Sequence, residues 1–388
     1  DLKKIIDDSY KHFSNPKIAP ITRIEQNKYI LELFYGPTFA FKDYALQFLG
    51  NLFTYALPKA SKKLTVLGAT SGDTGSAAIH AFRGKQDINV FILHPHNRVS
   101  DVQRRQMTTV QDDNIFNIAI KGNFDDCQKI VKELFIDDEL QQHTSLTAIN
   151  SINWARLMAQ VVYYFWAYLQ IDEQEINFIV PSGNFGNVFS ANVAKKMGLP
   201  INQLHITTNQ NDILHSSIKN GLMKKNVVTQ TYSPSMDIQV SSNFERQLFE
   251  SSGRDSETIN NIFHEFSKNN LYRFDKRIQH DLQSSYSTTA VSNDETLNAI
   301  KQIKQKYNYL ADPHTSTGLH ALLEKDANLP WVSLACAHPA KFGDAIEKAT
   351  GEPPVLPKDL SKLFDKEEKM TILDNNKNIL KSLILKNL

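Results

Sequence analysis

Short apolar runs alternate with amphipathic stretches along most of the chain, and this alternation constrains the fold more than any other feature of the sequence. The apolar runs have the length and β-branched content of buried strands, and each is followed by a segment with helical spacing. The first series has strands predicted at residues 64–67, 90–93 and 115–120, with helices starting near Thr74, Val99 and Phe124. Strand and helix alternating in this way predict a parallel sheet flanked by helices.

A second series follows a long apolar helix predicted over residues 153–169. Its strands are predicted at 177–180, 204–207 and 331–335. The sequence between the last two strands is mostly helical, and residues 284–293 are predicted to be a polar, Ser/Thr-rich loop. At the end of the chain, residues 375–388 have helical spacing and are expected to dock on the body of the protein.

Two such series predict an α/β fold with two lobes, each a mostly parallel sheet flanked by helices. A cleft between two lobes is a common place for a small-molecule site. The expected division is an N-terminal segment over residues 1–41 that leads into the large domain, a small α/β domain over 42–157 and a large domain over 158–388.

Charge and cysteine usage exclude several classes of protein. The 43 basic and 42 acidic side chains leave a net charge of +1, which gives no electrostatic footprint for nucleic acid or an anionic membrane. Cys127 and Cys336 stand far apart with no zinc-binding pattern around them, so neither a disulfide framework nor a metal site is expected. A reducing, cytoplasmic setting fits this usage best.

No membrane span is expected either, because the longest apolar stretch, residues 158–171, is shorter than the roughly 18 residues that a spanning helix needs. The chain begins at Asp1 without an initiator methionine or a signal-peptide pattern. This argues against secretion and suggests that a leading segment is missing.

The segment GPTFAFKD, residues 36–43, places Lys42 between a turn and the start of a helix. A Gly-Pro pair favours the turn, and Phe39 and Phe41 flank the lysine with apolar surface. Partial burial favours the neutral, nucleophilic amine over the ammonium, which suits a lysine that forms a Schiff base. The alternative is a solvated lysine whose stem lies along apolar surface.

Two glycine-rich segments each follow a predicted strand and open a helix. GATSGDTGSAA, residues 68–78, gathers amides and hydroxyls at a helix N-terminus, a geometry that binds anions, although the same residues also suit a simple capping turn. VPSGNFGNVF, residues 180–189, adds donors from Ser182, Asn184 and Asn187 to two glycines and predicts a cradle for one phosphate. Two cradles suggest two phosphates, or a phosphate and a carboxylate.

Two further segments offer polar side chains near element ends. NSINWAR, residues 150–156, carries Arg156, a residue type suited to bidentate capture of phosphate or carboxylate, although a capped helix with a surface arginine is the alternative. LACAHPAKF, residues 334–342, ends a strand with Cys336 and His338, and a lone histidine in such a place is most often a structural hydrogen-bonding residue. DPHTSTGLHAL, residues 312–322, is interpreted as a turn and helix that lie near the site.

Taken in order, GPTFAFKD, GATSGDTGSAA, NSINWAR, PSGNFGN and AHPAKF resemble the threonine synthase family, pyridoxal-phosphate enzymes of fold type II, the tryptophan synthase β-like group. The resemblance extends from about Tyr29 to Lys348. The family's N-terminal region is expected to be largely absent from this chain. The resemblance implies the two-lobed fold type II architecture and a pyridoxal 5'-phosphate cofactor. The protein is expected to be a cytoplasmic monomer or homodimer.

The resemblance also implies roles for individual residues. Lys42 would form the internal aldimine with the cofactor and act as acid and base, and Asp73 would lie beside the cofactor's 3'-oxygen. The cofactor phosphate would be held by the loop Ser182, Gly183, Asn184, Phe185, Gly186 and Asn187. Cys336 stands where the family usually has a threonine that bonds the pyridine nitrogen; the alternative is a buried cysteine that acts as a small apolar residue. The substrate would be bound by Thr70, Ser71, Thr74, Ser151, Asn153 and Arg156.

The activity that the resemblance implies is conversion of O-phospho-L-homoserine and water to L-threonine and inorganic phosphate, the last step of threonine biosynthesis. Two alternatives stay open at this point. A serine/threonine dehydratase would share the lysine and the glycine-rich loop but would not need Arg156 or a second phosphate cradle. A non-catalytic homologue that binds a phosphorylated metabolite would not need an intact Lys42.

Overall fold

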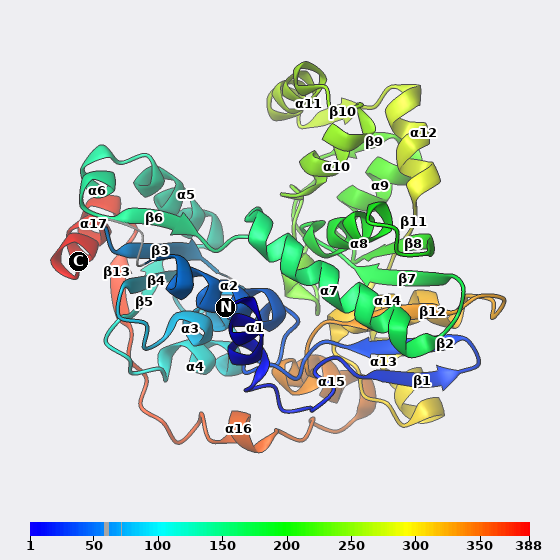
Figure 1. Ribbon diagram of the computed structural model, residues 1–388, viewed down its shortest axis with the longest axis horizontal. Helices are drawn as coiled ribbons and strands as arrows, with labels where there is room; N and C mark the ends of the chain where they lie inside the picture. Colours follow the sequence, from blue (N-terminus) through cyan, green and yellow to red (C-terminus); the bar gives the residue numbers. More distant parts are fainter. Residues whose placement is uncertain (58–61, 71) are drawn as a thin grey trace. The chain divides into compact units, whose positions relative to one another are not determined.

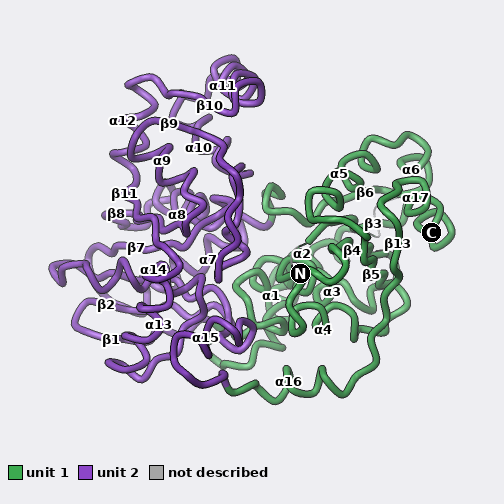
Figure 2. Tube along the Cα trace, turned by 180° about the vertical axis from the view of Figure 1, so that it is seen from behind, with its two compact units in different colours: residues 1–18, 35–155, 355–388 green, residues 19–34, 156–354 purple. Residues whose placement is uncertain are grey.

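The structure is a computed structural model that describes residues 1–57, 62–70 and 72–388. The chain divides into two compact units, shown in two colours in Figure 2. Unit 1 consists of residues 1–18, 35–155 and 355–388, and unit 2 of residues 19–34 and 156–354. Each unit is therefore assembled from segments that are distant in the sequence.

Unit 1 is built around a five-stranded parallel sheet (Figure 1). Its strands are β3 (Leu64–Ala69), β4 (Ile88–Pro95), β5 (Ile115–Lys121), β6 (Ser145–Ala148) and β13 (Thr371–Asp374). Its helices are α1 (Leu2–Tyr10), α2 (Lys42–Ala56), α3 (Asp73–Phe82), α4 (Asp101–Thr108), α5 (Phe124–Phe135), α6 (Asp138–His143), α16 (Lys358–Ser361) and α17 (Lys377–Lys386). The strand order is β13-β5-β4-β3-β6, and every neighbouring pair is parallel.

Helices cover this sheet on both faces because successive side chains of a strand point to opposite sides. Val90 and Ile92 of β4 pack with residues of α2, α3 and α4, among them Ile79 and Met107. Phe91 and Leu93 of the same strand pack on the other side with residues of α5, α6 and α17. The sheet is thus buried on both faces, as its continuous apolar strands predict.

Unit 2 contains a six-stranded mixed sheet and a two-stranded ribbon (Figure 1). Its strands are β1 (Ile21–Glu25), β2 (Lys28–Glu32), β7 (Ile176–Pro181), β8 (Ile201–Thr208), β9 (Leu222–Lys224), β10 (Leu271–Arg273), β11 (Tyr286–Ala290) and β12 (Trp331–Ala335). Its helices are α8 (Gly186–Lys196), α9 (Ile213–Asn220), α10 (Phe244–Ser251), α11 (Ser256–Asn269), α12 (Lys276–Ser285), α13 (Asn293–Tyr307), α14 (Pro313–Leu323) and α15 (Gly343–Thr350), with short 3₁₀ turns η2 (Pro234–Met236) and η3 (Pro339–Lys341). Helix α7 (Trp154–Ile171) begins at the end of unit 1 and continues into unit 2.

The large sheet has the order β1-β2-β12-β7-β8-β11, and only the β1-β2 pair is antiparallel. Helix α14 packs against β7, β8 and β12, and α8 packs against β8. Helix α7 contacts β7 where the Tyr164 ring meets the edge of Phe178, with ring centroids 4.9 Å apart. The α/β architecture with two mostly parallel sheets is therefore confirmed.

The units divide the chain at other places than the ranges expected from the sequence. Residues 355–388 group with unit 1, since β13 extends its sheet beside β5 and α17 buries Leu380 and Ile384 in its core. Residues 19–34 group with unit 2 because β2 pairs with β12. Both joins are long-range strand pairings, which local sequence patterns do not specify. The docking of the last helix is confirmed.

The predicted polar loop at 284–293 is wrong, because Tyr286–Ala290 form the edge strand β11 beside β8. Its hydroxyls find partners in the sheet, where Ser287 Oγ lies 2.7 Å from Nδ1 of His205 and Thr289 Oγ1 lies 3.0 Å from Nε2. Polar side chains that bond a neighbouring strand can occupy a sheet edge, so composition alone misidentifies this segment.

Candidate functional site

Lys42 is the first residue of α2, and its side chain is largely buried. The amine Nζ lies 3.3 Å from Oδ2 of Asp73 and 5.8 Å from the centre of the Phe41 ring. A helix N-terminus disfavours a positive charge, whereas the adjacent carboxylate favours it. The lysine is therefore the partly desolvated amine that the sequence predicts and not the solvated alternative.

A tight turn before α2 fixes where Lys42 emerges. The buried carboxylate of Asp43 accepts hydrogen bonds from the backbone N–H of Thr38 at 2.8 Å and from its hydroxyl at 2.7 Å. Gly36 lies so close that a Cβ there would be 2.4 Å from Cβ of Asp43. Phe39 has a φ of +58°, a conformation that is unfavourable for a bulky residue and that the surrounding turn must hold.

The second segment of the site in unit 1 is the start of α3. Asp73 is buried there, directly after Gly72, whose φ of +147° only glycine readily adopts. The hydroxyl oxygen of Thr70 accepts hydrogen bonds from the backbone N–H groups of Gly72 at 3.0 Å and Gly75 at 2.9 Å, which is a helix-capping role. Thr74 is partly buried in the first turn, and Ser71 lies outside the described residues.

Asp73 has a further partner that sequence reasoning missed. Nε2 of Gln103, from α4, donates a hydrogen bond to Oδ1 of Asp73 at 2.8 Å, and the Gln103 side chain is buried. Lys42, Asp73 and Gln103 therefore form one contact chain within unit 1. The sequence carries no signal for it, because α4 is a polar helix and the contact joins residues 30 positions apart.

The predicted residues around the start of α7 fall in different environments. Ser151 and Asn153 are partly buried, and Oδ1 of Asn153 accepts a hydrogen bond from the backbone N–H of Ala155 at 3.0 Å, as a helix cap does. Arg156 is buried, which excludes the solvated surface arginine of the alternative interpretation. Burial lowers the pKa of Arg156 to about 10, so the guanidinium still carries its charge at neutral pH.

In unit 2 the loop between β7 and α8 is held close to other backbone. A Cβ on Gly183 would lie 3.1 Å from both the Ser235 carbonyl oxygen and Cα of Met236, so that any larger residue would push the chains apart. The carbonyl oxygen of Gly183 accepts a hydrogen bond from the Ser241 hydroxyl at 2.8 Å. The backbone carbonyl oxygen of Asn184 accepts a hydrogen bond from the backbone N–H of Asn243 at 3.1 Å.

The same loop turns into α8 through an unusual backbone. Phe185 is fully buried with a φ of +60°, and its ring packs against Tyr286 with centroids 5.5 Å apart. Ser182 is buried, and its N–H donates to the carbonyl oxygen of Thr207 at 2.9 Å. The start of the loop therefore stays hydrogen-bonded to β8, and the chain then turns sharply at Phe185. This turn places Gly186 at the first position of α8.

Asn187 presents a donor at this helix start. Its Oδ1 accepts hydrogen bonds from the hydroxyls of Tyr163 and Tyr164, both of α7, the latter at 2.6 Å. Its buried Nδ2 has no hydrogen-bond partner among the residues that the structure describes. Since the carbonyl end is already engaged, the amide nitrogen is left as a donor for a ligand. Neither tyrosine was singled out by the sequence, because both lie in a long apolar helix.

Cys336 follows β12 and is buried. Its backbone N–H donates to the hydroxyl oxygen of Thr315 at 2.9 Å, and Thr315 in turn donates to the buried carboxylate of Asp312. Burial, and to a smaller extent the nearby Cys336 thiol, raises the pKa of Tyr164 well above its usual 10. The thiol therefore lies near the tyrosine that holds Asn187.

The segment at 312–322 supports both parts of the site in unit 2. Asp312 also accepts a hydrogen bond from Nδ1 of His314 at 2.8 Å, so that Nε2 of the ring can accept one from the backbone N–H of Ser235 at 3.1 Å. Ser235 is the residue whose carbonyl oxygen approaches Gly183. His338, in contrast, has the structural role predicted for it, since its Nδ1 accepts a hydrogen bond from the backbone N–H of Ala340 at 3.2 Å.

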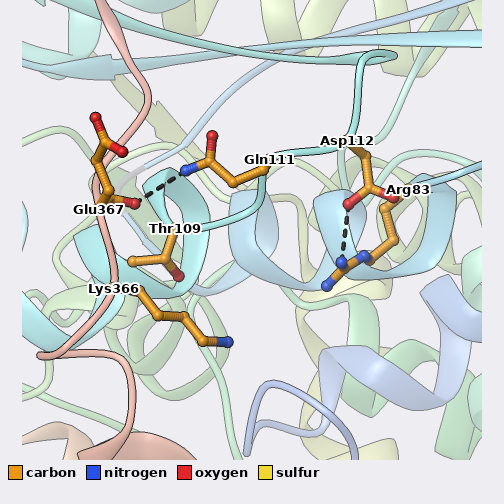
Figure 3. A pocket seen from close by; sticks show the side chains of 6 residues that line it. All are labelled: Arg83, Thr109, Gln111, Asp112, Lys366 and Glu367. Atoms are coloured by element: carbon orange, nitrogen blue, oxygen red, sulfur yellow. Dashed lines mark hydrogen bonds and ion pairs between the residues drawn. The ribbon is translucent and has the colours of Figure 1, made fainter.

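A pocket of about 320 Å³ lies elsewhere on unit 1 and contains none of the predicted site residues (Figure 3). Its charged side chains are of both signs, and Arg83 is paired with Asp112 at 2.8 Å. The residues that line it are Arg83, Thr109, Gln111, Asp112, Lys366 and Glu367.

Residues 1–57, 62–70 and 72–388 contain neither a candidate metal site nor a candidate membrane span. No group of three or more His, Cys, Asp or Glu side chains in these ranges could hold a metal ion. Of the helices within them, none combines the length and the apolar character that a membrane crossing requires.

Two protein families match the chain. Residues 18–262 match the family described as pyridoxal-phosphate dependent enzyme, and residues 315–384 match the one described as threonine synthase, C-terminal. Together the two matches include Lys42, Asp73, Arg156, the loop at 182–187 and Cys336.

Individual proteins of this kind are similar over nearly the whole chain. A threonine synthase from Pseudomonas aeruginosa is 46% identical over 97% of this chain and 81% of its own length. A crystal structure of pyridoxal-phosphate-bound threonine synthase from Brucella melitensis has a TM-score of 0.96 at 43% identity, covering 100% of this chain and 84% of that one. The structure of threonine synthase from yeast has a TM-score of 0.93 at 41% identity, with the same shares covered.

Proposed function

Because the chain belongs to the threonine synthase family of pyridoxal-phosphate-dependent enzymes, we propose that it converts O-phospho-L-homoserine and water to L-threonine and inorganic phosphate. It is a lyase, and the reaction would be the last step of threonine biosynthesis. The observation that carries the proposal is the largely buried Lys42 side chain at the start of α2, whose amine lies 3.3 Å from the carboxylate of Asp73.

The residues of the loop between β7 and α8 fit a cofactor phosphate. The loop at 182–187 contains no carboxylate, opens a helix, and ends in the unpaired buried donor Nδ2 of Asn187. An anion at a helix N-terminus is stabilised by backbone N–H groups and by the helix dipole. Ser182, Gly183, Asn184, Phe185, Gly186 and Asn187 are therefore proposed to hold the phosphate of pyridoxal 5'-phosphate.

Lys42 is proposed to carry the cofactor and to move protons. When bound, pyridoxal phosphate supplies an electron sink that stabilises carbanions at Cα and Cβ of the substrate, which expulsion of a γ-phosphate requires. The amine of Lys42 then takes the proton from Cα of the substrate and returns protons at later steps. Asp73, paired with this amine, is proposed to lie beside the cofactor's 3'-oxygen, and Cys336 to face the ring nitrogen as an uncharged partner.

Substrate recognition is proposed to rest mainly on Arg156. A buried guanidinium that keeps its charge is a strong partner for phosphate or carboxylate, because charge-assisted hydrogen bonds strengthen away from water. Thr74, Ser151 and Asn153 are proposed to add hydrogen bonds, together with Ser71. Thr70 is proposed to contribute to this set by holding the turn, since its hydroxyl oxygen already caps α3.

The decisive experiment is a stoichiometric assay with O-phospho-L-homoserine. We expect the purified enzyme to release one phosphate for each L-threonine formed. A serine/threonine dehydratase would instead form 2-oxobutyrate from L-threonine without releasing phosphate. Formation of 2-oxobutyrate from L-threonine, together with no phosphate release from O-phospho-L-homoserine, would overturn the proposal in favour of that alternative.

Location and assembly are part of the same proposal. Cys127 and Cys336 are both buried and neither forms a disulfide bond, which suits a reducing cytoplasm. We propose that the enzyme works there as a monomer or homodimer. Light scattering coupled to size-exclusion chromatography measures the mass in solution, and a mass above twice 44.1 kDa would contradict this part.

A further inference from the structure

Gln103 contacts the site although no motif contains it. It lies in α4, is 3% exposed, and donates from Nε2 to Oδ1 of Asp73 at 2.8 Å. The other oxygen of the same carboxylate, Oδ2, faces Nζ of Lys42 at 3.3 Å. A carboxylate with each oxygen engaged in a different direction cannot rotate without breaking one of the two contacts.

The amide of Gln103 is itself oriented from both ends. A carboxylate oxygen can only accept, so the NH₂ group must face Asp73, and the amide oxygen then faces Ser100. The Ser100 hydroxyl lies 3.0 Å from Oε1 of Gln103 and also caps α4 by accepting from the N–H of Gln103 at 3.4 Å. The start of α4 therefore fixes the direction in which Gln103 donates.

Gly72 makes room for this contact. A Cβ at Gly72 would lie 2.5 Å from Cδ of Gln103, so the amide crosses the turn before α3 at a distance that only glycine permits. The φ of +147° at Gly72 makes the same demand on the backbone. The turn is thus shaped to bring Gln103 onto Asp73, the first residue of α3.

We propose that Gln103 is a positioning residue, which holds the carboxylate of Asp73 through Oδ1 so that Oδ2 faces the amine of Lys42. At the N-terminus of α2 the ammonium form of Lys42 is disfavoured, and the aligned carboxylate offsets this. Gln103 thereby controls how readily Lys42 gives up its proton. The inference rests on the proposed function only in that Lys42 is taken as the lysine that carries the cofactor.

The test measures the reactivity of Lys42 directly. The full chain, freed of cofactor with hydroxylamine, is treated at pH 8 with acetic anhydride, and acetylation at Lys42 is followed by peptide mass spectrometry. Only the neutral amine reacts, so weakening its pairing with Asp73 raises the rate. We expect Gln103→Met to raise the labelling rate about three- to tenfold, the effect of one ordinary hydrogen bond, because the lost contact acts on Lys42 only through Asp73. Asp73→Asn should raise it at least as much.

The double variant Gln103→Met/Asp73→Asn shows whether Gln103 acts through Asp73 or through a general loosening of α4. If Gln103 acts through Asp73, then Gln103→Met changes the rate no further once Asp73→Asn is present. The matched control is Asn117→Leu, which removes another buried amide that holds α4, through Nδ2 to the carbonyl oxygen of Met107 at 2.9 Å. This control should leave the labelling rate of Lys42 unchanged.

Ser100→Ala tests the inference should Gln103→Met fail to fold. Removing the hydroxyl that orients the amide should raise the labelling rate about twofold, again only when Asp73 is intact. An unchanged rate in Ser100→Ala and Gln103→Met, equal acceleration by Asn117→Leu, or additive effects in the double variant would each overturn the inference. Borohydride reduction of the untreated wild-type enzyme reports separately whether Lys42 carries the cofactor, so a failure of the proposed function is recognised independently.

Discussion

The hydroxyl of Tyr164 lies 2.6 Å from Oδ1 of Asn187 and 3.1 Å from the backbone oxygen of the same residue. The raised pKa of Tyr164 keeps this hydroxyl protonated at neutral pH, so it donates. The amide of Asn187 is thereby held with its oxygen on the tyrosines, which leaves Nδ2 as the donor for the proposed contact with the cofactor phosphate.

Tyr164→Phe should weaken binding of pyridoxal phosphate about three- to tenfold, since one orienting hydrogen bond is lost while the ring is kept. Equilibrium titration of cofactor-free enzyme measures this. Tyr286→Phe is the matched control, because that buried tyrosine also donates to an amide oxygen at 2.6 Å, but to Gln247. Equal losses in the two variants would show that Asn187 is not held for the cofactor.

Lys42→Ala should abolish turnover while leaving the fold intact, since the largely buried Lys42 side chain belongs to neither apolar core cluster of unit 1 and its removal leaves no large apolar cavity. Borohydride reduction followed by peptide mapping should find cofactor attached to Lys42 in the wild type and to no lysine in the variant. Residual activity with cofactor attached to another lysine would contradict the assignment. Far-UV circular dichroism of both proteins controls for folding.

Arg156→Leu should keep the absorbance of the bound cofactor but lose efficiency with O-phospho-L-homoserine. A lost charge-assisted contact costs on the order of 1.5 to 3 kcal/mol, or roughly ten- to a hundredfold in kcat/KM. Leucine keeps most of the buried volume, so the cofactor loop should be little disturbed. Loss of cofactor with unchanged substrate kinetics would reverse the proposed role.

Glu368 lies in the C-terminal segment of unit 1, residues 355–388, and binds this segment to α4. Its carboxylate accepts from Nε of Arg104 at 2.8 Å and from the hydroxyl of Thr108 at 2.6 Å, and these contacts lower its pKa from 4.5 to about 2. A lowered carboxylate pKa stabilises the fold fully above pH 4.5, and this stabilisation is lost as the pH falls through about 2.

Glu368→Gln should therefore lower the free energy of unfolding by about 1 to 2 kcal/mol at pH 7. Below pH 5 the free energies of the variant and the wild type should become more similar, because the wild type loses the stabilisation from Glu368. Urea unfolding at pH 7 and pH 3.5 measures both differences. Asp374→Asn is a suitable control because its ion pair with Lys121 is exposed. If the difference in free energy of unfolding between Glu368→Gln and the wild type is the same at both pH values, the ion pair of Glu368 is not its cause.

Strands β3, β4, β5, β7, β8 and β12 were predictable because their apolar runs are local. Lys42 was predictable because its turn and flanking aromatics are contiguous. The strand pairings that connect distant segments of the chain were not predictable. The pairing of β13 with β5 and the polar edge strand β11 depend on partners far away in the chain. Sequence patterns describe a segment's own surface but not what covers it.

The same limit applies within the site. The motifs supplied Asp73 and Asn187, yet the residues that orient them, Gln103 and Tyr164, come from helices with no distinguishing pattern. Thr70 shows the converse, since a hydroxyl in an anion-binding motif turns out to cap a helix. A motif predicts which groups gather at a loop, and only tertiary contacts decide which of them remain available to a ligand.

Cys336 provides the last prediction, because the resemblance to the threonine synthase family leads us to expect a threonine at this position. Its backbone is fixed by Thr315 and its thiol is a weak donor of about the size of a hydroxyl, so Cys336→Thr should keep or improve turnover. Cys336→Asp would place a carboxylate in a buried position near Tyr164, where it favours a protonated cofactor ring. We expect a changed absorbance of the bound cofactor and at least a tenfold lower kcat in that variant.

Cys127→Asp is not a usable control since it breaks the core of unit 1, whereas Cys127→Ser, which keeps the size of the side chain, should leave the spectrum unchanged. If the Asp variant binds cofactor and turns over like the parent with the same spectrum, Cys336 does not face the ring.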